Sequence, residues 1–170
     1  NYNAASAKIY TDLGLFTANK DINDDVQDLF NVMTGYGLVS HYRKLLVSPH
    51  TLRPGITKLI RREIEQHKKH GNGHIIIKCN QLVDYEMVKV LYEASRAGVK
   101  IECIVRGICS LRPGLPGVSD TITVRSIVGR LLEHARIYYF HNNGDEEMYF
   151  GSADLMTRNL NGRIEVLTPL

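Results

Sequence analysis

Three short groups in the second half of the chain combine residue types that could bind or transfer phosphate. Val105-Arg106-Gly107 ends an expected buried strand, Glu133-His134-Ala135-Arg136 directly precedes a strand, and Gly151-Ser152-Ala153-Asp154 directly follows one. Ligands of open α/β sheets bind at the carboxyl ends of the strands, where the first group lies. Arginine presents a fork of donors that matches phosphate oxygens. The small residues of the third group let backbone N–H groups approach an anion. Singly, each group has a plainer interpretation, as a surface arginine, a structural histidine or a turn.

Taken together, the last two groups resemble the second half-site of the phospholipase D superfamily. The pattern of that superfamily is H-x-K followed by G-S-x-N/D, and arginine replaces the lysine here. The resemblance implies that the histidine exchanges protons or phosphoryl groups, that the basic residue holds the anion and that the Gly-Ser turn contributes donors. It therefore gives supporting roles to Arg136, Ser152 and Asp154.

Longer runs make the resemblance more specific, because they look like the C-terminal region of bacterial polyphosphate kinase. These runs are Asn80 to Asp84, Leu91 to Val99, Ile104 to Gly114, Val124 to His134 and Gly151 to Leu160, together with the N-terminal strings Asn1-Tyr2-Asn3, Tyr10-Thr11-Asp12 and Leu15-Phe16-Thr17. The similarity covers essentially the whole chain.

The resemblance to that family implies reversible transfer of the terminal phosphate of ATP to inorganic polyphosphate through a phosphohistidine. His134 matches a histidine at the nucleotide site, where it would contact the transferring phosphate or act as acid and base. Arg106 matches an arginine that binds nucleotide phosphate, and Tyr10 matches a tyrosine that contacts the nucleotide. The partners implied are ATP or ADP and polyphosphate, with Mg²⁺ in the full-length enzyme and a homo-oligomeric parent.

The family pattern also implies that part of the active site lies upstream of this chain. The phosphorylated histidine of the family precedes an H-x-G-T-G-N-Y-N string, and the chain begins at its N-Y-N. We therefore expect residues 1–40 to be the tail end of a first phospholipase D-like half and residues 41–170 to be the second half, without the C-terminal tail. The nucleophile and the arginines of the Mg²⁺ site would be missing, so we expect the isolated chain to be inactive.

The charge balance agrees with polyanionic substrates but not with a dedicated nucleic-acid binder. Net charge is only +3, from 21 lysines and arginines against 18 aspartates and glutamates. The second half contains no lysine after Lys100, and arginine suits bidentate contact with phosphate. Its arginines are Arg106, Arg112, Arg125, Arg130, Arg136, Arg158 and Arg163. We expect three or four of them, with Arg158 a candidate, to face the site, and the rest to pair with acids such as Glu133, Asp154 or Glu165.

The cysteine content and the hydropathy of the chain indicate in which cellular compartment the protein works. The odd count of three cysteines, Cys79, Cys103 and Cys109, argues against a secreted disulfide scaffold, and without a CxxC pair we expect no metal site in the chain. No apolar run approaches ~18 residues, the length that a membrane-spanning helix requires. The N-terminus lacks the features of a signal peptide. We therefore expect a cytoplasmic protein, whose parent enzyme could still associate with membranes.

These groups require an alternation of strands and helices to position them. The patterns predict strands at 9–16, 44–48, 74–78, 100–105, 121–126, 136–140, 147–150 and 162–167, and helices at 22–33, capped by Asp21, from Thr51 or Pro54 to Lys69, and after Asp84 to Gly98. A short helical turn is expected at 128–132 and a hairpin turn at 142–145. The fold class is α/β: a phospholipase D-like layered domain with a mixed, largely parallel sheet flanked by helices.

Two other functions remain open at this point. A phospholipase D-type phosphodiesterase or nuclease would use the same fold and a phosphohistidine, but would transfer the group to water or an alcohol. A non-catalytic phosphate-binding module would need only the basic residues. The runs around Arg106 and Arg125, and arginine at 136 in place of lysine, favour the kinase over a generic phosphodiesterase.

Overall fold

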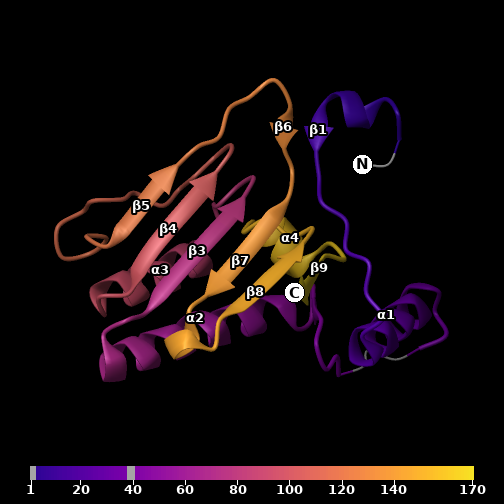
Figure 1. Cartoon of the computed structure of the whole chain (residues 1–170), viewed down its shortest axis with the longest axis horizontal. Coiled ribbons are helices and arrows are strands. Elements are labelled where there is room, and N and C mark those ends of the chain that lie inside the picture. The colour runs from indigo at the N-terminus through magenta and orange to yellow at the C-terminus, as the bar shows by residue number, and fades with distance from the viewer. Residues whose placement is uncertain (1–2, 38–40) are drawn as a thin grey trace.

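The structure is a computed structural model that describes residues 3–37 and 41–170. In this part of the chain a seven-stranded sheet has the order β2-β9-β8-β7-β3-β4-β5, and a separate two-stranded pair joins β1 to β6 (Figure 1). The helices are α1 (Lys20–Met33), α2 (Leu52–His70), α3 (Tyr85–Arg96) and α4 (Thr157–Asn161), with 3-10 turns η1 (Ser6–Lys8) and η2 (Asn142–Gly144). The strands are β1 (Tyr10–Thr11), β2 (Leu46–Val47), β3 (His74–Cys79), β4 (Lys100–Val105), β5 (Ile122–Arg125), β6 (Leu132–Glu133), β7 (Arg136–Phe140), β8 (Glu147–Gly151) and β9 (Val166–Pro169).

The central unit is the β3-α3-β4 crossover, and it forms as the sequence predicts. Strands β3 and β4 pair in parallel over six residues, with α3 between them in the chain. The Asp84 side chain caps α3 by accepting the Met87 N–H, which has no partner within the helix. The predicted cap, helix and two strands are therefore confirmed.

Helix α2 forms close to its predicted range and buries one stripe of residues. Ile56, Ile60 and Glu63 are fully buried, and Leu59 and Ile64 nearly so. The helix ends at Gly71, whose φ of 72° is a left-handed conformation that glycine adopts without steric cost. This stripe fixes the face that α2 turns to the sheet.

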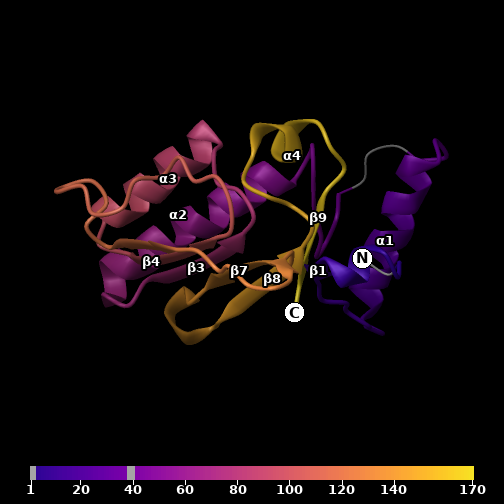
Figure 2. The same cartoon turned by 90° about the horizontal axis from the view of Figure 1, so that it is seen from above.

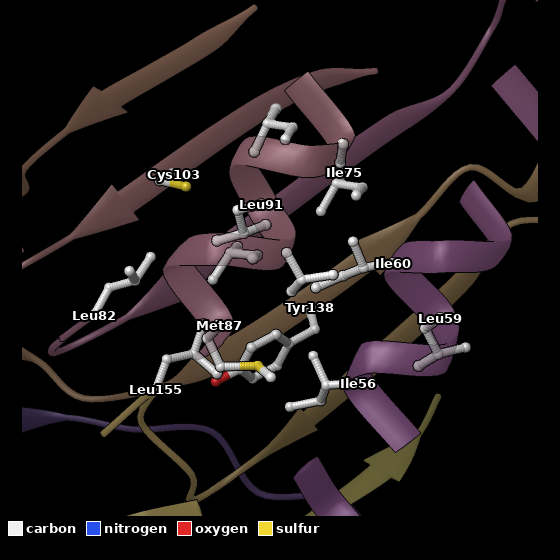
Figure 3. Close-up of a cluster of buried hydrophobic side chains, with 14 of the residues drawn as sticks. Ile56, Leu59, Ile60, Ile75, Leu82, Met87, Leu91, Cys103, Tyr138 and Leu155 are labelled. Carbon is white, nitrogen blue, oxygen red and sulfur yellow. The ribbon is translucent and has the colours of Figure 1, made fainter. Parts of the chain in front are cut away.

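Helices α2 and α3 lie on the same face of the sheet, as the view from above shows (Figure 2). Their apolar side chains meet those of β3, β4 and β7, with Tyr138 among them (Figure 3). Burial along β3 alternates residue by residue, so Ile75 and Ile77 are buried while Ile76 is half-buried. No helix in the described part of the chain has the length and apolar character to cross a bilayer.

The sheet is mixed, as expected, but it is not largely parallel. The β3–β4 and β4–β5 pairs are parallel, whereas β7 pairs antiparallel with both β3 and β8, and β9 pairs antiparallel with both β8 and β2. For β7 and β8 the reason is connection length, because the predicted hairpin between them is short and a short turn allows only antiparallel pairing.

Two predictions about the segments beside the site are wrong. The strand expected over 9–16 forms only at Tyr10–Thr11, and the helical turn expected over 128–132 is absent, because Leu132–Glu133 instead forms β6 and pairs in parallel with β1. Ile9, Leu13 and Phe16 are 50%, 55% and 99% exposed, so no sheet face receives their apolar side chains. Strand-forming residue types alone therefore did not make a strand here.

Other boundaries shift for local reasons. Asn19, not Asp21, caps α1, because its side chain accepts the Ile22 N–H, and Asp21 lies in the first turn. Phe30 and Met33 of this helix are exposed, so its buried face is limited to Ile22, Asp25 and Leu29. The strands predicted at 44–48 and 162–167 form at β2 and β9. The expected domain boundary at 40/41 and the string Asn1-Tyr2 involve residues outside the described ranges.

A second, smaller core joins α1 to β2. It consists of Ile22, Leu29, Leu45 and Val47. The carboxylate of Asp25, only 2% exposed, accepts the backbone N–H groups of Arg43, Lys44 and Leu45. A buried carboxylate is tolerated when such donors satisfy it, so Asp25 fastens the entry to β2 onto α1.

Candidate functional site

His134 lies between β6 and β7, at a point where the N-terminal segment meets the second half of the chain. Its neighbour Glu133 pairs with Thr11, and Leu132 pairs with Tyr10, so the short β1–β6 ladder carries the N-terminal segment to the histidine (Figure 1). The Leu132 N–H also donates to the carbonyl of Ile9, at 2.8 Å. This pairing brings together two of the predicted site residues, Tyr10 and His134.

The His134 ring has close partners from the N-terminal segment. Its Nδ1 lies 3.1 Å from Oδ2 of Asp12, and its centroid lies 5.2 Å from that of Tyr10. Partial burial by itself would raise the pKa of Asp12, but the hydrogen bonds from His134 and from the Leu13 N–H outweigh it and leave that pKa lowered. Asp12 therefore faces the imidazole as a carboxylate that can orient the ring.

Arg136 packs against the other side of His134. Its Nη1 lies 3.1 Å from Nε2 and 3.2 Å from Nδ1 of the ring, and donates to the His134 carbonyl at 2.8 Å. The nearly equal distances to the two ring nitrogens place this Nη1 over the ring. The guanidinium also forms a two-point ion pair with Asp154, from Nε to Oδ1 at 3.3 Å and from Nη2 to Oδ2 at 3.1 Å.

Asp154 explains the last position of the G-S-x-D group. Besides Arg136, its Oδ1 accepts the N–H of Asn80 at 2.7 Å and that of Gln81 at 3.3 Å, at the end of β3. The side chains of Arg136 and Asp154 are only 11% and 9% exposed. Asp154 thus connects the carboxyl end of β3 to the start of β7 and holds Arg136 against the His134 ring. This pairing with Asp154 is one of those expected for the arginines of the second half.

The glycine of the same group is required by a close approach of two strands. A Cβ at Gly151 would lie 1.9 Å from the carbonyl oxygen of Val166 in β9, too close for any other residue. The adjacent Ser152 N–H donates to that same carbonyl, and the Ser152 hydroxyl donates to the buried carboxylate of Glu165. In this structure, then, the Ser152 N–H and hydroxyl are used within the protein.

Arg106 reaches the same edge of the sheet but lines a different cavity. Its Nη1 donates to the Glu133 carbonyl at 2.6 Å, one residue from His134. With Lys78, Asn80 and Glu133 it lines a small cavity beside the strand ends. The structure therefore brings Arg106 to the backbone next to His134 and not to its ring.

Arg158 is more remote from these groups. It lies on α4 and is exposed. Among the described residues, the lining of the cleft beside His134 includes Arg136 and Ser152 but not Arg158. No contact in the described part of the structure supports the predicted role of Arg158, which stays a prediction.

The cleft itself has a volume of about 620 Å³ and two kinds of wall. Its polar lining includes Asp12, His134, Arg136 and Ser152. Apolar residues make up much of the remaining wall, among them Leu13, Ile22, Val26, Leu45 and Phe150. An imidazole beside a cation and a carboxylate in the lining of such a cleft can bind an anion and exchange a proton with it.

The sequence predicts no role in the site for Asp12 or Asn80, and it predicts an arginine as the partner of Glu165, yet all three residues take part in this arrangement. Asp12 orients His134, Asn80 donates its backbone N–H to Asp154, and Glu165 holds Ser152. Asn80 also contacts the Glu133 carbonyl and Arg136 in the amide orientation that gives both of its side-chain atoms partners. The available signal was position, since Asp12 follows Tyr10 by two residues and Asn80 directly follows a buried strand.

The carboxylates of the site do not fit a magnesium site. Asp154 is held by Arg136 and two backbone N–H groups, and Asp12 faces His134. Across residues 3–37 and 41–170 no group of three or more His, Cys, Asp or Glu side chains is arranged to hold a metal ion. We therefore assign none of the described residues to Mg²⁺.

Comparison with known families gives this geometry a context. The family model described as polyphosphate kinase C-terminal domain 2 matches residues 45–170, and that of C-terminal domain 1 matches residues 1–38. The chain belongs to the polyphosphate kinase family. A polyphosphate kinase of Prosthecochloris aestuarii is 56% identical over all 170 residues, which are 24% of its own length. The chain thus spans about a quarter of the length of the curated relatives it matches.

Solved structures agree with this assignment and extend it to the fold. The crystal structure of polyphosphate kinase from Porphyromonas gingivalis matches with a TM-score of 0.95 and 45% identity, covering 100% of this chain and 26% of that one. A phospholipase D family member, Nuc from Salmonella typhimurium, matches with a TM-score of 0.52 and 12% identity, over 74% of this chain and 80% of that one. At that identity the match shows the phospholipase D-like fold alone.

Proposed function

We propose that this chain supplies the nucleotide-phosphate side of a polyphosphate kinase active site, with residues 1–40 ending the first phospholipase D-like half and residues 41–170 forming the second. The enzyme would transfer the terminal phosphate of ATP reversibly to inorganic polyphosphate through a phosphohistidine. The observation that carries the proposal is the imidazole of His134, which contacts Asp12, Tyr10 and Arg136 in the lining of the cleft.

Each group has a role that its contacts support. The Asp12 carboxylate accepts a hydrogen bond from Nδ1 of His134, and Nε2, which lies 3.1 Å from Nη1 of Arg136, would meet a phosphoryl oxygen as acid or base. The fixed positive charge of Arg136 beside the ring favours the negative charge of the incoming phosphate. Arg106 and Tyr10 would contact the nucleotide, Arg106 with the guanidinium donors that the Glu133 carbonyl does not occupy.

We further propose that the 170-residue chain binds these polyanions without turning them over. A covalent phosphoryl transfer needs its nucleophile, and the family pattern puts that histidine upstream of residue 1. In the whole enzyme ATP or ADP and polyphosphate would be the partners, Mg²⁺ would be held outside this segment, and the protein would be a cytoplasmic homo-oligomer without a nucleic-acid ligand. The low cysteine content supports the cytoplasmic location, and the modest net charge of +3 supports the lack of a nucleic-acid ligand.

Calorimetric titration of ATP and tripolyphosphate into the chain tests the assignment of the site. His134→Ala and Arg106→Ala should each weaken binding about tenfold, the cost of losing roughly one hydrogen bond to a charged group. His70→Ala and Arg96→Ala are matched controls, because both side chains are exposed and lie at the ends of α2 and α3. Unchanged affinity in both site variants would refute the assignment. Synthesis of polyphosphate from ATP by the isolated chain would refute its expected inactivity.

The alternative functions predict different outcomes in the same samples. A phosphodiesterase of the phospholipase D type should hydrolyse an activated phosphodiester such as bis(p-nitrophenyl) phosphate, with loss of activity in His134→Ala. A non-catalytic phosphate-binding module should bind tripolyphosphate with an affinity that depends on Arg106 but not on His134. We expect neither result.

A further inference from the structure

The backbone on both sides of His134 is held by cationic side chains from three different strands or strand ends. The carbonyl of Glu133 accepts from Arg106 at 2.6 Å, that of His134 accepts from Arg136 at 2.8 Å, and that of Ala135 accepts from Lys78 at 2.9 Å. Three consecutive peptide carbonyls thus each receive a charged donor. Lys78 is the member of this set to which the function proposed above gives no role.

Lys78 is held in place by its position in the centre of the sheet. It lies in β3, where its register partners are Ile104 on β4 and Ile137 on β7, so its aliphatic stem stands between two apolar neighbours. Its side chain is only 16% exposed. Besides the Ala135 carbonyl, its ammonium meets the carboxylate of Glu133 at 3.1 Å.

These two contacts lie on either side of the histidine. Glu133 precedes His134 and Ala135 follows it, so one ammonium group spans the residue that carries the imidazole. Removing an ammonium from water is costly, and the cost is met here by a carboxylate and a carbonyl that belong to the same three-residue segment. The segment has little other regular structure, because β6 ends at Glu133 and β7 begins at Arg136.

We propose that Lys78 is a positioning residue that sets the orientation of the His134 imidazole by fixing the peptide groups on both sides of it. The proposal rests on the function proposed for His134 and names a residue on which that function depends. Lys78 acts through the backbone, since it contacts neither the imidazole ring nor the large cleft in the described contacts.

The test uses three variants of the chain and two measurements. Lys78→Met removes the ammonium and keeps the stem, Lys78→Arg restores a cationic donor, and Lys100→Met is the matched control. Lys100 lies on the same face of the sheet, in register with His74, but pairs with Glu102 away from the site. The measurements are the side-chain NMR resonances of His134 without ligand and the affinity for tripolyphosphate by calorimetry.

We expect Lys78→Met to shift and broaden the His134 ring resonances and to weaken tripolyphosphate binding about tenfold, as for the loss of one hydrogen bond to a charged group. Lys78→Arg should recover most of both, and Lys100→Met should change neither. If Lys78→Met leaves the His134 resonances as they are in the parent chain, the positioning role is wrong. Glu133→Gln provides a second route to the same answer if Lys78→Met does not fold, because it weakens the other contact of the ammonium.

The two proposals fail in different ways. If His134→Ala binds tripolyphosphate as tightly as the parent chain, the proposed function fails, whatever Lys78 does. If His134→Ala weakens binding while Lys78→Met leaves the ring resonances and the affinity unchanged, only the positioning role fails.

Discussion

Among the single residues of the site, Asp154 connects the guanidinium beside the imidazole to the end of β3. It faces the guanidinium of Arg136 and also accepts the N–H groups of Asn80 and Gln81. Arg136 in turn touches the imidazole, so the aspartate is two contacts away from the group that would meet phosphate. Replacing it would leave a nearly buried guanidinium with a weaker partner.

Asp154→Asn should lower the free energy of unfolding by about 3 kcal/mol, because removing one member of a buried ion pair leaves the other charge uncompensated. Chemical denaturation monitored by circular dichroism measures the loss. Asp145→Asn, at an exposed position in the β7–β8 turn, is the control and should change little. Equal stability of the two variants would show that Arg136 does not depend on Asp154.

At the residue scale the sequence predicted which groups lie near one another but not how they are connected. His134, Arg136, Ser152 and Asp154 could be placed at one edge because their two groups bracket a hairpin. The contact between Arg136 and Asp154 was one of several open pairings. Arg106 donates to the Glu133 carbonyl, and Arg158 is exposed. Both outcomes depend on packing between residues far apart in the chain, which a local sequence pattern does not encode.

At the scale of elements, α3 begins at a carboxylate that also joins it to two other helices. Asp84 caps α3, binds Arg53 of α2 through two hydrogen bonds of 2.7 Å, and accepts the Thr157 hydroxyl of α4. Burial would raise the pKa of Asp84, but the hydrogen bonds from Arg53, Thr157 and Met87 lower it overall.

This lowered pKa predicts an acid-sensitive stability. A carboxyl whose folded pKa is below its unfolded value contributes its full stabilisation above about pH 4 and loses it as the pH falls through the folded pKa. Asp84→Asn should therefore be less stable than the parent chain by about 1–2 kcal/mol at pH 7, with a difference that shrinks below about pH 4. Thermal unfolding between pH 7 and pH 2.5 measures it. A difference that stays constant with pH would contradict the assignment.

Prediction of the elements succeeded where a periodic pattern was long enough to bury a face. Helices α2 and α3 and strands β3, β4, β7 and β8 have apolar residues that reach the main core, and their predicted positions are close to the observed ones. The segments 9–16 and 128–132 are short, and their apolar side chains stay largely exposed. Their conformation is decided by pairing with each other, which neither segment encodes alone.

At the scale of the whole molecule, the two hydrophobic cores divide the chain unequally. The main core joins the sheet to α2 and α3, and the small core joins α1 to β2. Stability is rarely uniform across such an arrangement, because a part with few buried contacts opens at lower cost. Asp25 is the polar link that strengthens the small core.

Asp25→Ala should therefore loosen α1 without unfolding the sheet. The change leaves three backbone N–H groups at Arg43, Lys44 and Leu45 without their acceptor, and amide hydrogen exchange in α1 and residues 43–47 should accelerate about tenfold or more. Amides of β3, β4 and β7 should exchange as before. Asp28→Ala on the exposed face of the same helix is the control, and similar exchange in the two variants would count against a separate small core.

The ladder between β1 and β6 has a consequence for how the site is completed. Its two residue pairs bring Asp12 to a histidine 122 positions later in the chain. So short a ladder is marginal in water, so Tyr10 and Asp12 can depart while the seven-stranded sheet persists. His134 therefore has Tyr10 and Asp12 as neighbours only while the N-terminal strand is paired with β6.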